Sequence, residues 1–156
     1  MEIQKSKKLV LNVPLQNDRE LTLNSVIVAA LCGETTEIKH FFLPPSLSPF
    51  LEMLQKVGIQ TTYVKDTLII QGLGLQKRDL GDVEFTLLDS VYANALLITY
   101  IAAQQFEFFH ITGTSIQIEQ SKTLIENLPY LSISDENEKG YFVKKDSEYI
   151  HRDTVK

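Results

Sequence analysis

The chain has 156 residues, of which 44% are apolar and 22% charged, as in an ordinary globular domain. Its net charge of −5 argues against binding to nucleic acid, which requires a basic face. The single cysteine, Cys32, excludes an intramolecular disulfide, and no apolar run is long enough to span a membrane. We therefore expect a cytoplasmic protein with no nucleic-acid or membrane partner.

The first part of the chain predicts a strand, an interior helix and a second strand. Residues 9–13 are mainly apolar and predict a short strand. Residues 20–32 are apolar on almost every side, and Asn17 followed by Glu20 has the composition of a capping box, so we expect a buried helix that begins there. Residues 35–41 are rich in β-branched side chains and alternate in polarity, which predicts a strand.

An amphipathic helix and a hairpin complete this part. Within residues 47–57, apolar side chains recur at the i, i+3, i+4, i+7 spacing of a helix with one buried face. Residues 59–64 and 67–71 then predict two short strands, and the two residues between them predict the turn of a hairpin.

The second part predicts the same elements in the same order. Its expected strands cover residues 83–88, 106–112, 130–134 and 141–145. Its expected helices cover residues 90–104, with Ser90 as the N-cap, and residues 119–128.

The two parts are also similar in sequence. Residues 37–41 (Glu-Ile-Lys-His-Phe) are echoed by residues 107–111 (Glu-Phe-Phe-His-Ile), and Asn24 by Asn94. This repetition indicates one supersecondary unit used twice, neither copy of which covers its own apolar face. We expect an inside-out α/β (α+β) domain, with the first helix of each unit in the interior and the sheets outside. The expected boundaries are one domain over residues 1–150, βαβαββ units at 9–74 and 83–146, and a polar tail at 147–156.

Five short motifs follow one another between residues 18 and 74. They are Asp18-Arg19-Glu20-Leu21-Thr22-Leu23-Asn24, Val28-Ala29-Ala30-Leu31, Thr35-Thr36-Glu37-Ile38, Met53-Leu54-Gln55-Lys56-Val57-Gly58-Ile59 and Ile70-Gln71-Gly72-Leu73-Gly74. Through these motifs the chain resembles the enolpyruvyl transferase superfamily, and within it the 5-enolpyruvylshikimate-3-phosphate (EPSP) synthases. The resemblance implies an inside-out α/β fold, of which complete members contain six units in two domains. It also implies carboxyvinyl transfer from phosphoenolpyruvate to shikimate 3-phosphate.

The same resemblance assigns candidate substrate-binding positions. They are Arg19, Glu20, Asn24, Ser90 and Gln117. At the first three the family has lysine, serine and arginine, so a single cation remains here. Two polyanionic substrates need several convergent cations, and the carboxylates of Asp18 and Glu20 flank Arg19. We assign no catalytic residue, expect no cofactor or metal, and predict that the isolated chain has no synthase activity.

Some interpretations remain open at this point. Arg19 either seats an anion together with the amides of a helix N-terminus or is an exposed arginine paired with Asp18 or Glu20. His40 and His110 hold equivalent places in two expected strands, where we expect surface or interface histidines. The chain is either half of an enolpyruvyl transferase, which binds a small phosphorylated anion and needs a complementary chain, or a non-catalytic binding or assembly module. A homo-oligomer is a further candidate assembly. A weaker resemblance is to the UDP-N-acetylglucosamine branch of the superfamily.

Overall fold

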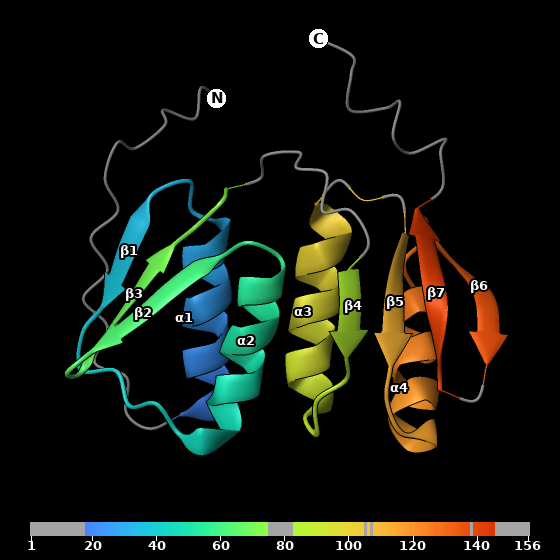
Figure 1. Ribbon diagram of the computed structural model, residues 1–156, viewed down its shortest axis with the longest axis horizontal. Coiled ribbons are helices and arrows are strands. Elements are labelled where there is room, and N and C mark those ends of the chain that lie inside the picture. The colour runs from blue at the N-terminus through green and yellow to red at the C-terminus, as the bar shows by residue number, and fades with distance from the viewer. Residues whose placement is uncertain (1–17, 75–82, 105, 107, 138, 146–156) are drawn as a thin grey trace, which may run out of the picture.

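The computed structural model describes residues 18–74, 83–104, 106, 108–137 and 139–145 (Figure 1). In what we call the first half, residues 18–74, the elements are α1 (Arg19–Leu31), β1 (Thr35–Ile38), the 3-10 turn η1 (Pro45–Leu47), α2 (Ser48–Lys56), β2 (Gln60–Val64) and β3 (Thr67–Gln71). In the second half, residues 83–145, they are β4 (Val83–Thr86), α3 (Val91–Ala103), β5 (Phe108–Thr112), α4 (Ser115–Glu126), β6 (Leu131–Asn137) and β7 (Gly140–Lys145). The expected strand at 9–13 and tail at 147–156 lie outside the described residues.

The strands form two separate sheets. In the first half the order is β1-β3-β2, and every pairing is antiparallel. In the second half the order is β4-β5-β7-β6, with β4 parallel to β5 and the other neighbours antiparallel. Figure 1 shows α1, α2 and α3 in the middle of the molecule between the two sheets. The fourth helix, α4, packs on α3 and on β6 of the second sheet. The expected inside-out α/β fold is therefore confirmed.

Buried and partly exposed side chains alternate along the strands, and this alternation explains how the sheets cover the helices. Leu68 and Ile70 of β3 point inward and are fully buried, and so are Phe109 and Ile111 of β5. The residues between them point outward and are half-buried, because successive side chains of a strand face opposite sides of the sheet. The inward side chains pack on the helices and create one continuous apolar core.

Both ends of α1 are held by specific contacts. At its start the side chain of Asp18 accepts a hydrogen bond from the amide of Leu21 at 3.0 Å. At its end, the amide of Leu73 donates to the carbonyl of Ala30 at 3.1 Å. A Cβ added to Gly72 would lie 2.0 Å from the Cys32 carbonyl oxygen, so glycine is required for this close approach.

Three sequence predictions are wrong in detail. The cap of α1 is Asp18 rather than the expected Asn17. The strand expected over residues 35–41 ends at Ile38, because His40 has a φ of +56° and turns the chain. The helix expected from Glu119 begins at Ser115, because Thr114 and Gln117 form a capping box that the search for apolar spacing missed.

The first helix of each half lies in the interior, as expected, but each leaves one side exposed. Leu21 and Val28 of α1 are 41% and 49% exposed, and Tyr92 of α3 is 38% exposed. Within the described part of the chain, no helix has the length and apolar character needed to cross a membrane.

Candidate functional site

The four helices begin at the same end of the molecule (Figure 1). Their aligned peptide dipoles and free amides make this end attractive to an anion. All five candidate residues lie toward this end, in the caps or the first two turns of the helices. Arg19, Glu20 and Asn24 belong to α1, Ser90 caps α3, and Gln117 is in the first turn of α4. The structure thus brings together residues that are distant in the sequence.

A hydrogen bond joins the second turn of α1 to the start of α3. The hydroxyl of Tyr92 donates to Oδ1 of Asn24 at 2.8 Å. The sequence comparison assigned Asn24 to substrate binding, yet its side-chain oxygen is already bonded to a neighbouring helix. Tyr92 was not among the predicted site residues, because its contact with Asn24 arises only from the packing of two helices.

The segment between β4 and α3 is fixed by two side chains. Asn94 bonds both backbone groups of Leu88, accepting from its amide and donating to its carbonyl, each at 2.8 Å. Nε2 of Gln117 donates to the same carbonyl at 3.2 Å and to Oδ1 of Asp89 at 3.3 Å. Ser90 accepts from the amide of Ala93 at 3.3 Å as the N-cap of α3. Gln117 and Ser90 are therefore engaged in holding this segment.

The charges at this end do not favour a polyanion. Asp18, Arg19 and Glu20 are all exposed, and so is Asp89, which shortly precedes α3. Among the described residues, Arg19 makes no ion pair with Asp18 or Glu20, so the pairing considered above is not formed. No other first turn of the described helices contains a lysine or arginine.

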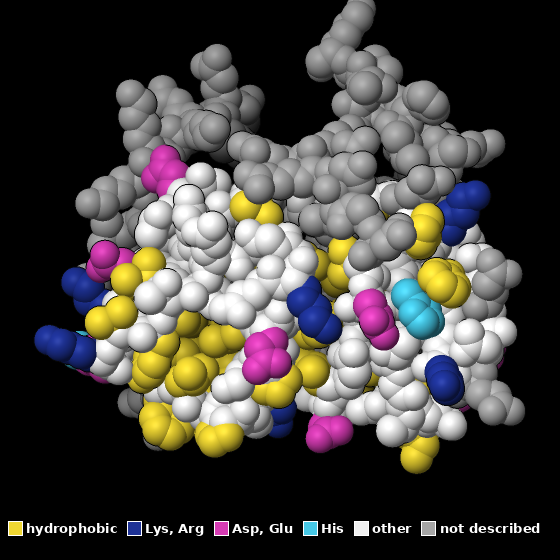
Figure 2. All heavy atoms as spheres, in the orientation of Figure 1, with side chains coloured by type: hydrophobic (Ala, Val, Ile, Leu, Met, Phe, Trp, Pro, Cys, Tyr) yellow, Lys and Arg dark blue, Asp and Glu magenta, His cyan; other side chains and the backbone are white. Residues whose placement is uncertain are grey.

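Apolar side chains occupy much of the same end. The large exposed ones at helix starts are Leu21, Val91, Tyr92 and Ile116, and Phe42 lies in the segment that leads to η1. On the face shown in Figure 2, basic side chains are scattered singly among apolar and acidic ones. The described residues contain no group of three metal-ligating side chains.

The two histidines that seemed equivalent in sequence have different surroundings. His40 lies in a turn, with Nδ1 3.0 Å from Oδ2 of Asp66, and both side chains are exposed. His110 lies within β5 and stacks on Phe142, with ring centroids 4.4 Å apart. Neither histidine belongs to the set of residues that fixes the helix starts.

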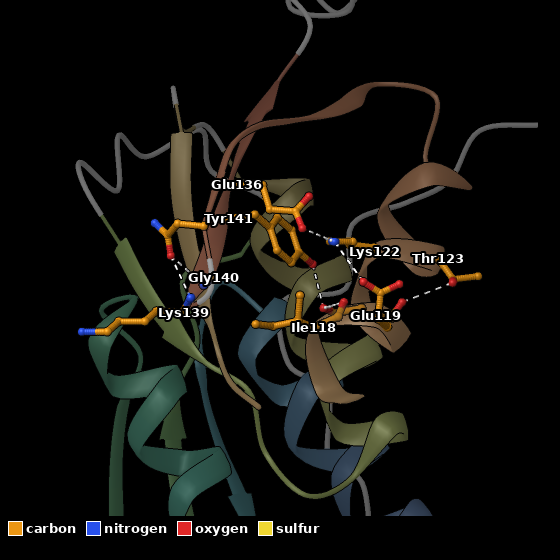
Figure 3. Close-up of polar contacts among 10 residues, drawn as sticks. Ile118, Glu119, Lys122, Thr123, Glu136, Lys139, Gly140 and Tyr141 are labelled. Atoms are coloured by element: carbon orange, nitrogen blue, oxygen red, sulfur yellow. Dashed lines mark hydrogen bonds and ion pairs between the residues drawn. The ribbon is translucent and has the colours of Figure 1, made fainter. Parts of the chain in front are cut away.

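A separate polar cluster attaches α4 to its sheet (Figure 3). Lys122 contacts Glu119 at 3.0 Å and Glu136 at 2.5 Å, and these hydrogen bonds raise the pKa of the Lys122 amine. The hydroxyl of Tyr141 donates to Oγ of Ser121 at 2.7 Å. Burial raises the pKa of the Tyr141 phenol. The cluster joins a helix to two strands and has the geometry of a structural contact.

Comparisons with known proteins support the fold of this chain. The chain is 26% identical over 116 residues to a 3-phosphoshikimate 1-carboxyvinyltransferase of Lactiplantibacillus plantarum, an alignment that covers 74% of this chain and 27% of the relative. Two solved EPSP synthases of Acinetobacter baumannii superpose with TM-scores of 0.54 and 0.53, at 18% and 16% identity. Each superposition covers 83% of this chain and 30% or 31% of the solved chain. No protein-family model matches the chain.

The chain therefore resembles EPSP synthases in fold and, weakly, in sequence. It spans less than a third of the length of the relatives that it matches. The predicted resemblance is confirmed at this level.

Proposed function

We propose that this chain is an EPSP-synthase-like domain that does not transfer a carboxyvinyl group on its own. In this proposal it consists of two βαβαββ units at residues 9–74 and 83–146 and works in the cytoplasm. The fold and the sequence similarity support the domain type. The charge at the helix starts supports the lack of activity, because Arg19 is the single cation in the first turns of the described helices, whereas Asp18, Glu20 and Asp89 lie at or just before helix starts.

The physical reason is the charge of the substrates. Phosphoenolpyruvate and shikimate 3-phosphate are both multiply negative, and bringing them together without neutralising cations is strongly unfavourable. Helix N-termini supply only partial charges, each worth about 0.3–1 kcal/mol at an exposed site. The helix starts of this chain could then hold one small phosphorylated anion but not the pair. A complementary chain would have to bring the missing cations.

A phosphate-release assay with both substrates tests this proposal. We expect no turnover above background for the full chain. The control variants are Arg19→Ala and Lys56→Ala, the second of which removes a cation at the opposite end of α2. Turnover by the wild-type chain that Arg19→Ala abolishes and Lys56→Ala leaves intact would refute the proposal.

A second candidate function is that of a non-catalytic assembly module. The exposed apolar side chains at the helix starts favour it, because Val91 and Ile116 are 54% and 74% exposed where an anion site would need polar groups. Calorimetric titration with shikimate 3-phosphate distinguishes the two candidate functions. Heat of binding that Arg19→Ala removes supports an anion-binding half-enzyme, whereas no heat supports the assembly module.

A further inference from the structure

The two sheets have the same strand arrangement except at one edge. In each sheet, the strand that follows the first helix of its half pairs with the second strand of a hairpin, β1 with β3 and β5 with β7. The second sheet then continues past β5 to β4, which precedes the first helix of that half and lies parallel to β5. Among the described residues, β1 pairs with β3 alone. We call the side of β1 away from β3 the β1 edge.

The inward side chains of β1 are less covered than those of β5. Phe109 and Ile111 of β5, which has a neighbouring strand on each side, are fully buried. Thr36 and Ile38 of β1 are only half-buried, although Ile38 stands directly opposite the fully buried Leu68 and therefore faces the core. A strand on the β1 edge would cover these two side chains, as β4 covers those of β5.

The position of α1 fixes how the preceding chain can reach this edge. Both β1 and β5 run toward the end of the molecule at which the helices begin (Figure 1). In the second half β4 ends there too, and residues 87–89 connect it to the N-cap of α3. A strand connected to α1 by a similarly short link also ends at that end, which makes it parallel to β1. A helix between two parallel strands is the ordinary way to connect them.

The sequence before α1 has the composition of such a strand. Residues 9–13, which lie outside the described residues, read Leu-Val-Leu-Asn-Val and carry no charge. Aliphatic side chains of this kind suit a strand that packs one face on a core. Residues 14–17 then lead to Asp18, the N-cap of α1, a link of about the same length as that between β4 and α3.

Counting back from the helix caps predicts which side chains of this segment face the core. In the second half, Phe85 is fully buried and stands five positions before the cap Ser90. In the first half, the residue five positions before the cap Asp18 is Val13. Because alternate residues of a strand share a face, Leu11 would face the core together with Val13.

We propose that residues 9–13 of this chain bind the β1 edge as a parallel strand, with Leu11 and Val13 facing the core and Asn12 facing water. The bound segment covers the exposed part of Ile38, and its backbone pairs with the amides and carbonyls on the outer side of β1. This inference takes the first unit of the proposed function, residues 9–74, as its premise. It does not depend on whether the chain is active, because it concerns the edge of a sheet rather than the helix starts.

A matched pair of variants tests which side of the segment is buried. Val13→Asp places a carboxylate toward the core, and we expect it to lower the equilibrium constant for folding by at least about 30-fold. Asn12→Asp introduces the same charge one position earlier, on the side that faces water, and should change that constant by less than about 3-fold. Urea unfolding of the full-length variants, followed by circular dichroism, measures both constants. Equal effects of the two changes would overturn the proposal.

An engineered disulfide tests the pairing itself, in a chain that carries Cys32→Ser so that the introduced cysteines are the only ones. In the second sheet, Glu84 of β4 stands opposite His110 of β5. The equivalent pair in the first sheet is Asn12 and Glu37, because Glu37 and His110 each precede the last inward residue of their strand. Opposite residues of neighbouring strands are about 4.8 Å apart, a separation that a disulfide can bridge.

We expect the chain with Asn12→Cys and Glu37→Cys to form an intramolecular disulfide on mild oxidation, detected by mass spectrometry of its proteolytic fragments. The matched control carries Asn12→Cys and Thr62→Cys, which places the second cysteine on β2 at the opposite edge of the same sheet. The control should not form the bond. A missing bond in the first variant, equal bonds in both variants, or a bond between two chains would each overturn the proposal.

Discussion

The second helices of the two halves differ in how much of their surface they bury. In the first half, α2 contacts β2 of its own half and also α3 and β4 of the other half. In the second half, α4 contacts only α3 and β6 among the more extensive helix and strand contacts of the described residues. The buried residues of α2 are Phe50, Leu51, Met53 and Leu54, whereas those of α4 are Ile118, Ser121 and Ile125. Because α2 lies between the two halves, it needs a wide apolar surface. Because the more extensive contacts of α4 lie within its own half, a narrow apolar surface is enough.

The two asparagines that the sequence matched show a similar difference. Asn94 is 6% exposed and bonds both backbone groups of Leu88. Asn24 is half-buried and accepts one hydrogen bond from Tyr92. Equivalent positions in the sequence have therefore come to serve different contacts, one within a half and one between the halves.

The largest expected effects come from two glycines, one in each half. A Cβ at Gly72 would meet the carbonyl oxygen of Cys32 at 2.0 Å, and a Cβ at Gly140 would meet that of Ile111 at 2.0 Å. Because backbone cannot move aside easily, Gly72→Ala and Gly140→Ala should each cost more than about 3 kcal/mol of stability. Urea unfolding followed by circular dichroism measures this. Gly33→Ala is the control, since nothing lies within 4 Å of its added Cβ.

The difference between α2 and α4 can be tested with one leucine from each. Leu54 of α2 is fully buried, and Leu124 of α4 is half-buried. We expect Leu54→Ala to lower the free energy of unfolding by about 3 kcal/mol and Leu124→Ala by about 1 kcal/mol, because the first leaves a closed cavity. Equal losses in urea unfolding would contradict the view that α2 alone is enclosed by both halves.

Replacing the two asparagines should give a smaller difference in stability than replacing the two leucines. Asn94→Ala removes two partly buried hydrogen bonds and leaves the Leu88 amide without this partner, so we expect a loss of about 2 kcal/mol. Asn24→Ala removes one exposed hydrogen bond and should cost about 0.5 kcal/mol. Thermal unfolding of both variants, with Tyr92→Phe as the control for the Asn24 contact, measures the difference. A larger loss for Asn24→Ala would reverse our ranking of the two contacts.

The smallest expected effect is a loss of folding stability at alkaline pH. It arises from Tyr141, a residue of the second half. The pKa of Tyr141 is raised in the folded protein, chiefly by burial, so the unfolded chain loses the phenol proton first as pH increases. The stability contributed by this group is complete below its ordinary pKa of 10.0 and is lost as pH rises through the folded value. Urea unfolding between pH 8 and about pH 11 should show this loss, since that range spans the ordinary tyrosine pKa. Tyr141→Phe should lose less stability over the same range, and an unchanged slope would contradict the assignment.

Pattern in the sequence was enough to predict most elements and the general fold. The apolar character of residues 20–32 and 90–104 predicted the interior helices, because side chains on every side of a helix can be apolar only if most are covered. Turn chemistry predicted the hairpin of β2 and β3, and Ser90 was correctly predicted as the N-cap of α3. The boundaries of α4 and β1 were missed, because capping and a left-handed turn act over single residues.

The candidate site depended far more on the tertiary structure. The sequence by itself determined which residue types stand at the helix starts, and therefore that Arg19 is a lone cation there. Only the tertiary structure decided that the helices start together, that Tyr92 bonds Asn24, and that Gln117 holds the Leu88 carbonyl. Local sequence fixes a helix and its caps because those interactions span a few residues. Contacts between helices depend on packing angles that no short segment specifies.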